Sequence, residues 1–324
     1  MCIRDRPRPE PGPGETLLRV TSVGVCGSDL HWFSSASIGD ARLEEPLVLG
    51  HEFAGVIASG PQRGQRVAVD PSIPCGTCEF CLQGKPNLCL DQRFAGHGLE
   101  DGALREYMTW PQACLHPLPD SLSDAEGVML EPLGVAIHAV DLGKIEPGMT
   151  VGVFGCGPIG LLMLQVARVA GATRIYATER LPERLQAARS LEATEALRAD
   201  GGRESARILE QTGGRGVDVA FEVSEENGAV EAALAAVVPG GTVVLAGIPD
   251  DDRTAFTASV ARRKGLTLKM VRRMVHTYPR ATRLVESGLV EVRSLVTHRF
   301  GLADFEQAFS VAATRTGLKV IIEP

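Results

Sequence analysis

The sequence predicts a two-domain α/β protein in which a β-rich domain is combined with a Rossmann-type, doubly wound parallel sheet. Three observations support this class. The chain has 324 residues, which is enough for two domains. Residues 7–127 contain short β-type stretches with many glycines and prolines and few helical patterns. From Thr150 onward, apolar strand patterns alternate with helical patterns, as in a parallel sheet covered by helices.

The α/β half can be divided into individual elements. It opens with a buried apolar strand, a glycine-rich turn and an apolar helix. A Pro239-Gly-Gly241 turn is expected between the last helix and the strand after it. Strands are predicted over 150–154, 174–178, 217–223, 242–247 and 266–271, and helices over 161–170 and 228–237.

Composition excludes several classes of protein. The net charge is −7, from 33 basic and 40 acidic residues, and only 5% of residues are aromatic, so no nucleic-acid partner is expected. The most apolar stretch, residues 151–170, is interrupted by glycines and polar residues, so no membrane span is expected. Without an apolar leader, we expect a cytoplasmic protein. Residues 1–6 show no pattern and resemble translated adapter sequence, so they are set aside as an artefact.

A dinucleotide-binding motif follows the first α/β strand. Gly155-Cys-Gly157-Pro-Ile-Gly160 fits G-x-G-x-x-G, and Glu179 ends the next strand 19 residues later. The glycines permit a tight turn and let a pyrophosphate approach the helix N-terminus closely. The carboxylate of Glu179 would accept hydrogen bonds from the ribose hydroxyls. Glu179 favours NAD over NADP, although Arg180 and Arg184 could each meet a 2′-phosphate.

Two groups of residues could bind zinc. Four of the eight cysteines have the spacing C-x2-C-x2-C-x7-C, which is typical of a closed structural site: Cys75, Cys78, Cys81 and Cys89. Cys26, His51 and Glu131 lie in glycine-bounded stretches, and a thiolate, an imidazole and a carboxylate leave the fourth zinc position to water or substrate. Each of these three residues is a weak signal by itself.

Together these motifs carry a family resemblance that covers nearly the whole chain from Pro7. GVCGSDLHWF, GHEFAG, EPLGVAIHA, GCGPIG and HTYPRATRLVESG resemble the zinc-dependent medium-chain dehydrogenases, and within them the polyol, sorbitol (L-iditol) dehydrogenase-like branch. The resemblance implies a GroES-like catalytic domain over 7–127 and 271–324 and a Rossmann domain over 128–270. It implies NAD-dependent oxidation of a secondary alcohol of a polyol to a ketose, with two zinc ions, in a homodimer or homotetramer.

The resemblance also assigns residue roles. Cys26, His51, Glu52 and Glu131 match the catalytic zinc site, and Ser28 and His31 match a proton relay. Trp32, Glu131, Arg273 and Met274 match substrate positions, with Met274 where a tyrosine is usual. Contacts to the cofactor are implied for Gly155, Gly157, Pro158, Ile159, Gly160, Glu179, Arg184, Ala246, Gly247, Ile248, Val271, Arg272 and Arg273.

Alternatives stay open at this point. Threonine, butanediol or simple alcohol dehydrogenases use the same scaffold. A truncated, non-catalytic relative that binds NAD or zinc would explain why the usual first hairpin is missing. One further departure is Ser224-Glu-Glu-Asn227, which replaces a small glycine turn of the family.

Overall fold

The computed structural model describes residues 5–249 and 251–324, so positions 1–4 of the segment set aside above lie outside it. The chain forms two compact units. The first combines the residues up to Pro132 with Val275–Pro324, and the second is the continuous stretch Leu133–Met274. The two-domain α/β class predicted from the sequence is confirmed.

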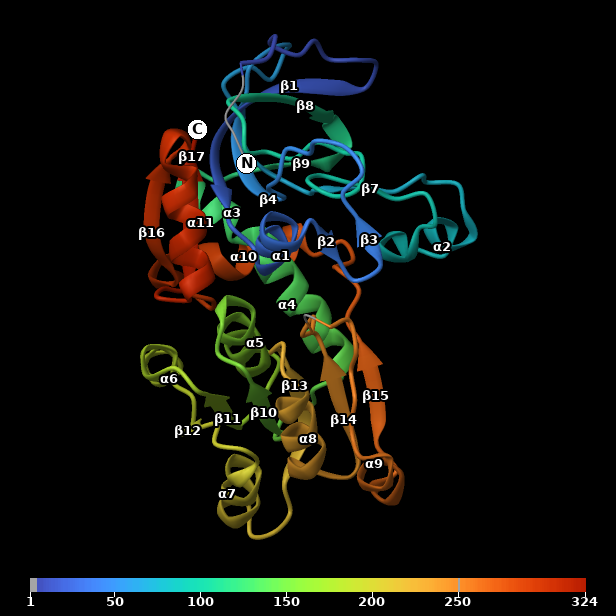
Figure 1. Ribbon diagram of the computed structural model, residues 1–324, viewed down its shortest axis with the longest axis vertical. Coiled ribbons are helices and arrows are strands. Elements are labelled where there is room, and N and C mark those ends of the chain that lie inside the picture. Colours follow the sequence, from blue (N-terminus) through green and yellow to red (C-terminus); the bar gives the residue numbers. More distant parts are fainter. Residues whose placement is uncertain (1–4, 250) are drawn as a thin grey trace. The chain divides into compact units, whose positions relative to one another are not determined.

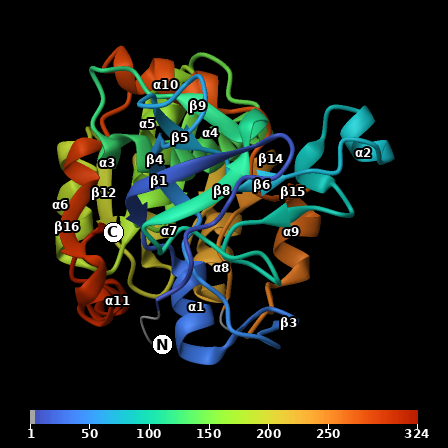
Figure 2. The same ribbon diagram turned by 90° about the horizontal axis from the view of Figure 1, so that it is seen from above.

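The first unit is built on a seven-stranded sheet to which both ends of the sequence contribute (Figures 1 and 2). Its order is β16-β17-β1-β4-β5-β9, and β8 also pairs with β1. Leu18, Val20 and Val23 of β1 are buried in one core cluster, with a shift in the pairing to β4 between Val20 and Ser22. The strands are β1 (Glu15–Gly24), β4 (Glu52–Ile57), β5 (Arg66–Val69), β8 (Tyr107–Pro111), β9 (Leu115–Pro117), β16 (Val296–Gly301) and β17 (Lys319–Glu323).

Helices and short ribbons surround this sheet. The helices are α1 (Gly27–Ser35), α2 (Glu79–Leu82), α3 (Asp124–Val128), α10 (Tyr278–Glu286) and α11 (Phe305–Thr314), and α4 (Leu130–Gly143) begins in this unit and ends in the other. The two short ribbons are β2 (Ser37–Ile38) with β3 (Ala41–Arg42), and β6 (Ser72–Ile73) with β7 (Arg93–Phe94).

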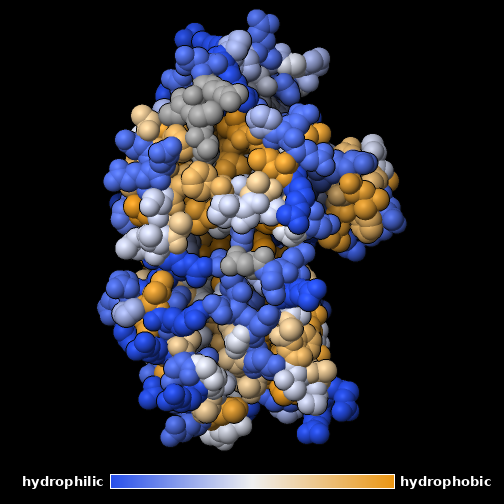
Figure 3. Space-filling model, in the orientation of Figure 1, coloured by the Kyte–Doolittle hydropathy of each residue, from blue (hydrophilic) through white to orange (hydrophobic). Residues whose placement is uncertain are grey.

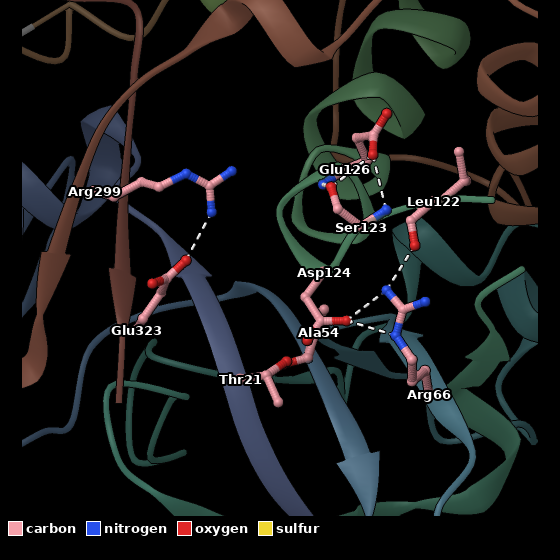
Figure 4. Close-up of polar contacts among 9 residues, drawn as sticks. All are labelled: Thr21, Ala54, Arg66, Leu122, Ser123, Asp124, Glu126, Arg299 and Glu323. Carbon is pink, nitrogen blue, oxygen red and sulfur yellow. Dashed lines mark hydrogen bonds and ion pairs between the residues drawn. The ribbon is translucent and has the colours of Figure 1, made fainter. Parts of the chain in front are cut away.

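Helix α3 is fixed to the sheet by polar contacts (Figure 4). The Ser123 hydroxyl accepts the Glu126 N–H at 3.3 Å, and the Glu126 carboxylate accepts the Ser123 N–H at 2.8 Å, which forms a capping box. Arg66 of β5 donates to Asp124 at 2.8 Å and to the Leu122 carbonyl at 2.6 Å. These contacts set the position from which α4 then starts.

The second unit is a six-stranded parallel sheet with the order β12-β11-β10-β13-β14-β15, which is the Rossmann arrangement. Its central strands β10 and β13 are buried along most of their length, as expected for parallel strands covered on both faces, whereas the edge strands β12 and β15 are less buried. The elements are β10 (Thr150–Phe154), α5 (Pro158–Val169), β11 (Arg174–Glu179), α6 (Pro182–Ser190), β12 (Glu195–Arg198), α7 (Arg203–Gln211), β13 (Val217–Glu222), α8 (Asn227–Ala236), β14 (Val237–Leu245), α9 (Ala258–Lys264) and β15 (Thr267–Met270).

One local expectation is modified. The Pro239-Gly-Gly241 segment lies within the bounds of β14, which begins earlier than predicted, at Val237. Val217 and Val219 of β13 face Val237 and Thr242, so four residues of β14 stand opposite Asp218, and Gly240 has a φ of 78°. The pairing is interrupted at the predicted turn and resumes at Thr242.

Two general features bear on the site. In the described part of the chain no helix combines the length and apolar character needed to cross a membrane. The seven cysteines in this part are all free thiols, so none is committed to a disulfide and each cluster can offer thiolates to a metal.

Candidate active site

Strand pairing brings Cys26, His51 and Glu52 together. Gly24 at the end of β1 lies opposite Glu52 at the start of β4, and Cys26 caps the following helix α1. One ligand atom from each of the three side chains lies within 4.8 Å of the other two. A Cβ atom at Gly24 would come within 2.2 Å of Glu52, so only glycine leaves room for the carboxylate. A thiol, an imidazole and a carboxylate at this spacing fit a zinc ion with one open position.

Asp29, which sequence reasoning missed, holds this group in place. Its carboxylate accepts the Cys26 N–H at 2.9 Å and the Gly50 N–H at 3.2 Å, and lies 3.4 Å from Nδ1 of His51. Burial alone would raise the pKa of Asp29, but His51 and these N–H groups lower it. Because Asp29 engages Nδ1, Nε2 of His51 is the nitrogen left for a metal. The available signal was an acid three residues after Cys26, in the first turn of a helix.

The charge of the group favours a cation. Burial alone would lower the pKa of His51, but Asp29 and Cys26 raise it well above its ordinary value. A proton therefore binds strongly where a metal would also bind, and the two compete for the same nitrogen.

Lys319, also missed from the sequence, forms a buried ion pair with Glu52. Its Nζ lies 2.7 and 2.6 Å from the two carboxylate oxygens, and the two side chains are 4% and 1% exposed. Nζ also donates to the Val25 carbonyl at 3.3 Å. The pair joins residues 267 positions apart, so no local pattern could reveal it.

Glu131 lies in the first turn of α4, buried and outside the three-residue group. Burial raises the pKa of its carboxyl to about 8, the negative charge of Glu52 adds to this, and His51 and Lys319 oppose it. The structure therefore places Glu131 within electrostatic reach of the group without making it a fourth member.

Ser28, His31 and Trp32 all lie on α1, directly after Cys26. Ser28 and His31 are partly exposed. Trp32 is only 5% exposed and packs in an apolar core with Val25 and Leu49, tilted against His97 at 5.3 Å between ring centroids. The structure thus gives Trp32 a packing role.

The four-cysteine motif closes into a second compact group around α2. The sulfur atoms of Cys75, Cys78, Cys81 and Cys89 all lie within 4.8 Å of one another. The backbone N–H groups of Thr77 and Cys78 lower the pKa of Cys75 to about 6, which favours the thiolate that binds metals. Four sulfur ligands leave no open position, so this arrangement suits a structural ion.

The glycine motif forms a tight turn between β10 and α5. Gly155 has a φ of 110°, and a Cβ atom at Gly160 would lie 1.9 Å from the Gly155 carbonyl oxygen. Gly157 caps α5 without any side-chain partner for the first N–H groups of the helix. Because no side chain covers these N–H groups, they can donate hydrogen bonds to a pyrophosphate.

Glu179 ends β11 beside this turn. Its carboxylate accepts N–H groups from Cys156 at 2.9 Å, Arg180 at 2.7 Å and Leu181 at 3.1 Å. The guanidinium group of Arg184 lies next to Gly157, 3.5 Å from where a Cβ atom would be. The acid and Arg184 are therefore on the same edge of the sheet as the glycine turn.

The other predicted cofactor residues follow β14 and β15 in the same unit. A Cβ atom at Gly247 would lie 1.6 Å from the Ser224 carbonyl oxygen, so the backbone is closely packed there. Arg273 has a φ of 52°, and Met274 is 8% exposed. Glu222, which sequence reasoning missed, ends β13 and is buried, and its carboxylate accepts the N–H and hydroxyl of Ser224 at 2.7 and 2.8 Å.

The fold and these sites define a zinc-binding dehydrogenase of the medium-chain class. The model of the alcohol dehydrogenase GroES-like domain matches residues 12–120, and that of the zinc-binding dehydrogenase matches residues 158–287. The chain belongs to this zinc-dependent alcohol dehydrogenase family. The resemblance stated from the sequence is thereby confirmed.

Full-length relatives support this assignment. The chain is 35% identical to sorbitol dehydrogenase of Bacillus subtilis, covering 99% of this chain and 94% of that protein. It is 38% identical to Probable D-xylulose reductase A of Emericella nidulans, covering 99% and 92%. A crystal structure of a zinc-binding dehydrogenase from Sinorhizobium meliloti bound to NADP matches with a TM-score of 0.91 at 30% identity, covering 99% and 95%. The family thus uses a nicotinamide cofactor and a small-molecule alcohol substrate.

Proposed function

We propose that this protein oxidises a secondary alcohol of a polyol to a ketose and transfers the hydride to NAD⁺. The single observation that carries the proposal is the buried group of Cys26, His51 and Glu52, with Asp29 and Lys319 around it. The relatives named above, a sorbitol dehydrogenase and a D-xylulose reductase, direct the choice among alcohols to polyols.

Cys26, His51 and Glu52 would hold the catalytic zinc, and Glu131 would act as a second nearby carboxylate that binds zinc or substrate. When bound, zinc supplies Lewis-acid chemistry that brings the pKa of an alcohol towards neutrality. The thiolate and one carboxylate balance the charge of Zn²⁺, so an ionised alcohol would leave little net charge buried.

Proton removal would use the start of α1. Ser28 would accept the alcohol proton and pass it outward through His31, since the two residues are one turn apart on the same helix. Both side chains are partly exposed, which gives the proton a route to water.

NAD would bind at the carboxyl edge of the parallel sheet, and it supplies the hydride acceptor. The turn from Gly155 to Gly160, with Pro158 and Ile159, would hold the pyrophosphate, and Glu179 would accept the adenosine ribose hydroxyls. Arg184 would neutralise phosphate charge. Residues after β14 and β15 would line the remainder of the cofactor: Ala246, Gly247, Ile248, Val271, Arg272 and Arg273.

A second zinc ion would be held by the four cysteines around α2 and would stabilise that loop. Two zinc ions per chain therefore form part of the proposal. Cysteines that bind a metal and form no disulfide are typical of reducing compartments, which supports a cytoplasmic location.

A homodimer or homotetramer is also proposed. Edge strand β15 ends in Met270, which is 63% exposed, and Ile248 is 46% exposed in the same unit. In the first unit, Leu82 and Leu90 around α2 are 76% and 74% exposed, and Figure 3 shows apolar surface on this lobe. Large apolar side chains exposed in this way are typical of surfaces that contact another subunit.

The test is NAD⁺ reduction, followed by nicotinamide absorbance, with polyols, threonine, butanediol and simple alcohols, each with and without a zinc chelator. Chelator-sensitive turnover that is fastest with a polyol supports the proposal. Faster turnover of threonine or butanediol would reassign the substrate, and with it the roles of the candidate substrate contacts Trp32, Glu131, Arg273 and Met274. No turnover with zinc and NAD⁺ bound would establish a non-catalytic relative.

A further inference from the structure

A surface ion pair joins two turns at the cofactor edge of the Rossmann sheet. Arg180 follows β11 directly after Glu179, and Glu226 closes the turn between β13 and α8. The guanidinium group of Arg180 contacts the carboxylate of Glu226. Strands β11 and β13 do not neighbour each other but flank β10, so the contact reaches across the end of the strand that precedes the glycine turn.

Arg180 is the cation placed to meet a phosphate on the adenosine ribose. The residue before it, Glu179, is fixed by three backbone N–H groups, so its carboxylate stays at the end of β11. Two other cations belong to this region: Arg184, whose guanidinium group lies next to Gly157 in the turn that would hold the pyrophosphate, and Arg198 of β12, the strand partner of Glu179. Arg180 is the one of these cations that follows Glu179 directly and is paired with Glu226, so its guanidinium group becomes available to a 2′-phosphate only when Glu226 releases it.

From this geometry we infer that Glu226 is a cofactor-specificity residue that selects NAD(H) over NADP(H). Its carboxylate is paired with the guanidinium group of Arg180 and adds a negative charge to the turn that Arg180 contacts. A dianionic 2′-phosphate would have to displace Glu226 from Arg180 and would also be repelled by it. NAD(H) has a hydroxyl at that position, so its binding would not be weakened by the charge of Glu226.

Exposure makes this competition direct. The side chains of Arg180 and Glu226 are 59% and 56% exposed, so a ligand can reach the pair without unfolding the turn. The pair also gives a function to Ser224-Glu-Glu-Asn227, which replaces the small glycine turn expected in the family. A glycine at position 226 would leave Arg180 without this carboxylate.

The inference rests on the proposed NAD dependence, and direct binding measurements separate the two. NADH and NADPH are titrated into the zinc-loaded protein and followed by nicotinamide fluorescence, at low and at physiological ionic strength. For Glu226→Gln we expect the Kd for NADPH to fall about threefold to tenfold, more at low salt, and the Kd for NADH to change less than about twofold.

Two further variants complete the test. Glu192→Gln breaks a comparable exposed ion pair in the same unit, in which Glu192 lies 3.2 Å from Arg168, and should leave both constants unchanged. Adding Arg180→Gln to Glu226→Gln should abolish the gain in NADPH binding. Equal changes for both cofactors, no tighter NADPH binding, or a gain that survives the loss of Arg180 would overturn the inference. Wild-type protein that binds neither dinucleotide, or prefers NADPH, would instead overturn the proposed NAD dependence and the inference with it.

Discussion

Replacing Lys319 by methionine should destabilise the metal-free protein far more than the zinc-loaded protein. Methionine keeps an unbranched side chain of similar length but removes the charge and all three hydrogen bonds of Nζ. Glu52 would then be a carboxylate that is 1% exposed and has lost its cation. Removing one partner of a buried ion pair typically costs about 3–5 kcal/mol.

Zinc should reduce this loss. If Glu52 is a zinc ligand, the metal replaces the missing positive charge, and the variant should recover part of its stability on loading. Urea unfolding of the metal-stripped and zinc-loaded proteins measures both values. The two tryptophans of the chain, Trp32 and Trp110, are buried in the first unit, so their fluorescence reports on that unit alone.

Two variants serve as controls for this prediction. Lys319→Arg keeps the charge and should lose much less stability. Adding Glu52→Gln to Lys319→Met removes both charges, so in metal-free protein the double variant should be more stable than Lys319→Met alone. A loss below about 1 kcal/mol in metal-free Lys319→Met, or an equal loss with and without zinc, would refute the reasoning.

The remaining predictions concern the zinc ions, the glycine turn and pH. Cys26→Ser and Cys75→Ser should each remove one of the two zinc ions per chain, which elemental analysis measures. Only Cys26→Ser should abolish turnover while the protein stays folded. Cys114→Ser lies outside both groups and should keep both zinc ions. Gly160→Ala places a Cβ atom 1.9 Å from a carbonyl oxygen and should weaken NADH binding at least about tenfold, whereas Gly228→Ala, with nothing within 4 Å, should bind normally. Burial raises the pKa of Glu222 from 4.5 to about 7, so the folded state binds more protons than the unfolded state between these values. The contribution of Glu222 to stability should therefore fall as pH rises from about 5 to 8, by up to about 3 kcal/mol, and Glu131, whose pKa burial raises to about 8, adds a slope of the same sign. Glu222→Gln should make the slope measured by urea unfolding and circular dichroism shallower without abolishing it; an unchanged slope would exclude Glu222 as one of its sources.

Local patterns predicted the parts of this protein that depend on neighbouring residues. The strand over 150–154, the glycine turn and the cysteine loop each lie within a short stretch whose spacing reflects its geometry. The early start of β14 at Val237 was missed because proline and two glycines ordinarily separate a strand from what precedes it, whereas Val237 already pairs with β13 before the interruption.

The environment of the candidate site could not be predicted in the same way. The pairing of Glu52 with Lys319 depends on β17 lying beside β1, and the spacing of residues in the sequence does not predict that contact. Trp32 was interpreted as a substrate contact by resemblance, and that role stays a prediction; its packing with residues of α11 and β17 could not be predicted from local spacing. Asp29 was the one missed residue with a local signal, since its place in the first turn of α1 allows it to accept the Cys26 N–H.

The placement of β17 between β16 and β1 has a consequence for synthesis on the ribosome. The second unit is one continuous stretch, so it can fold before residues 275–324 have been made. The first unit must wait, because an inner strand of its sheet, with the cation that neutralises Glu52, is translated after the whole second unit. Until then Glu52 lacks Lys319, and the nascent amino-terminal sheet presents an open edge along β1 to chaperones or to neighbouring chains.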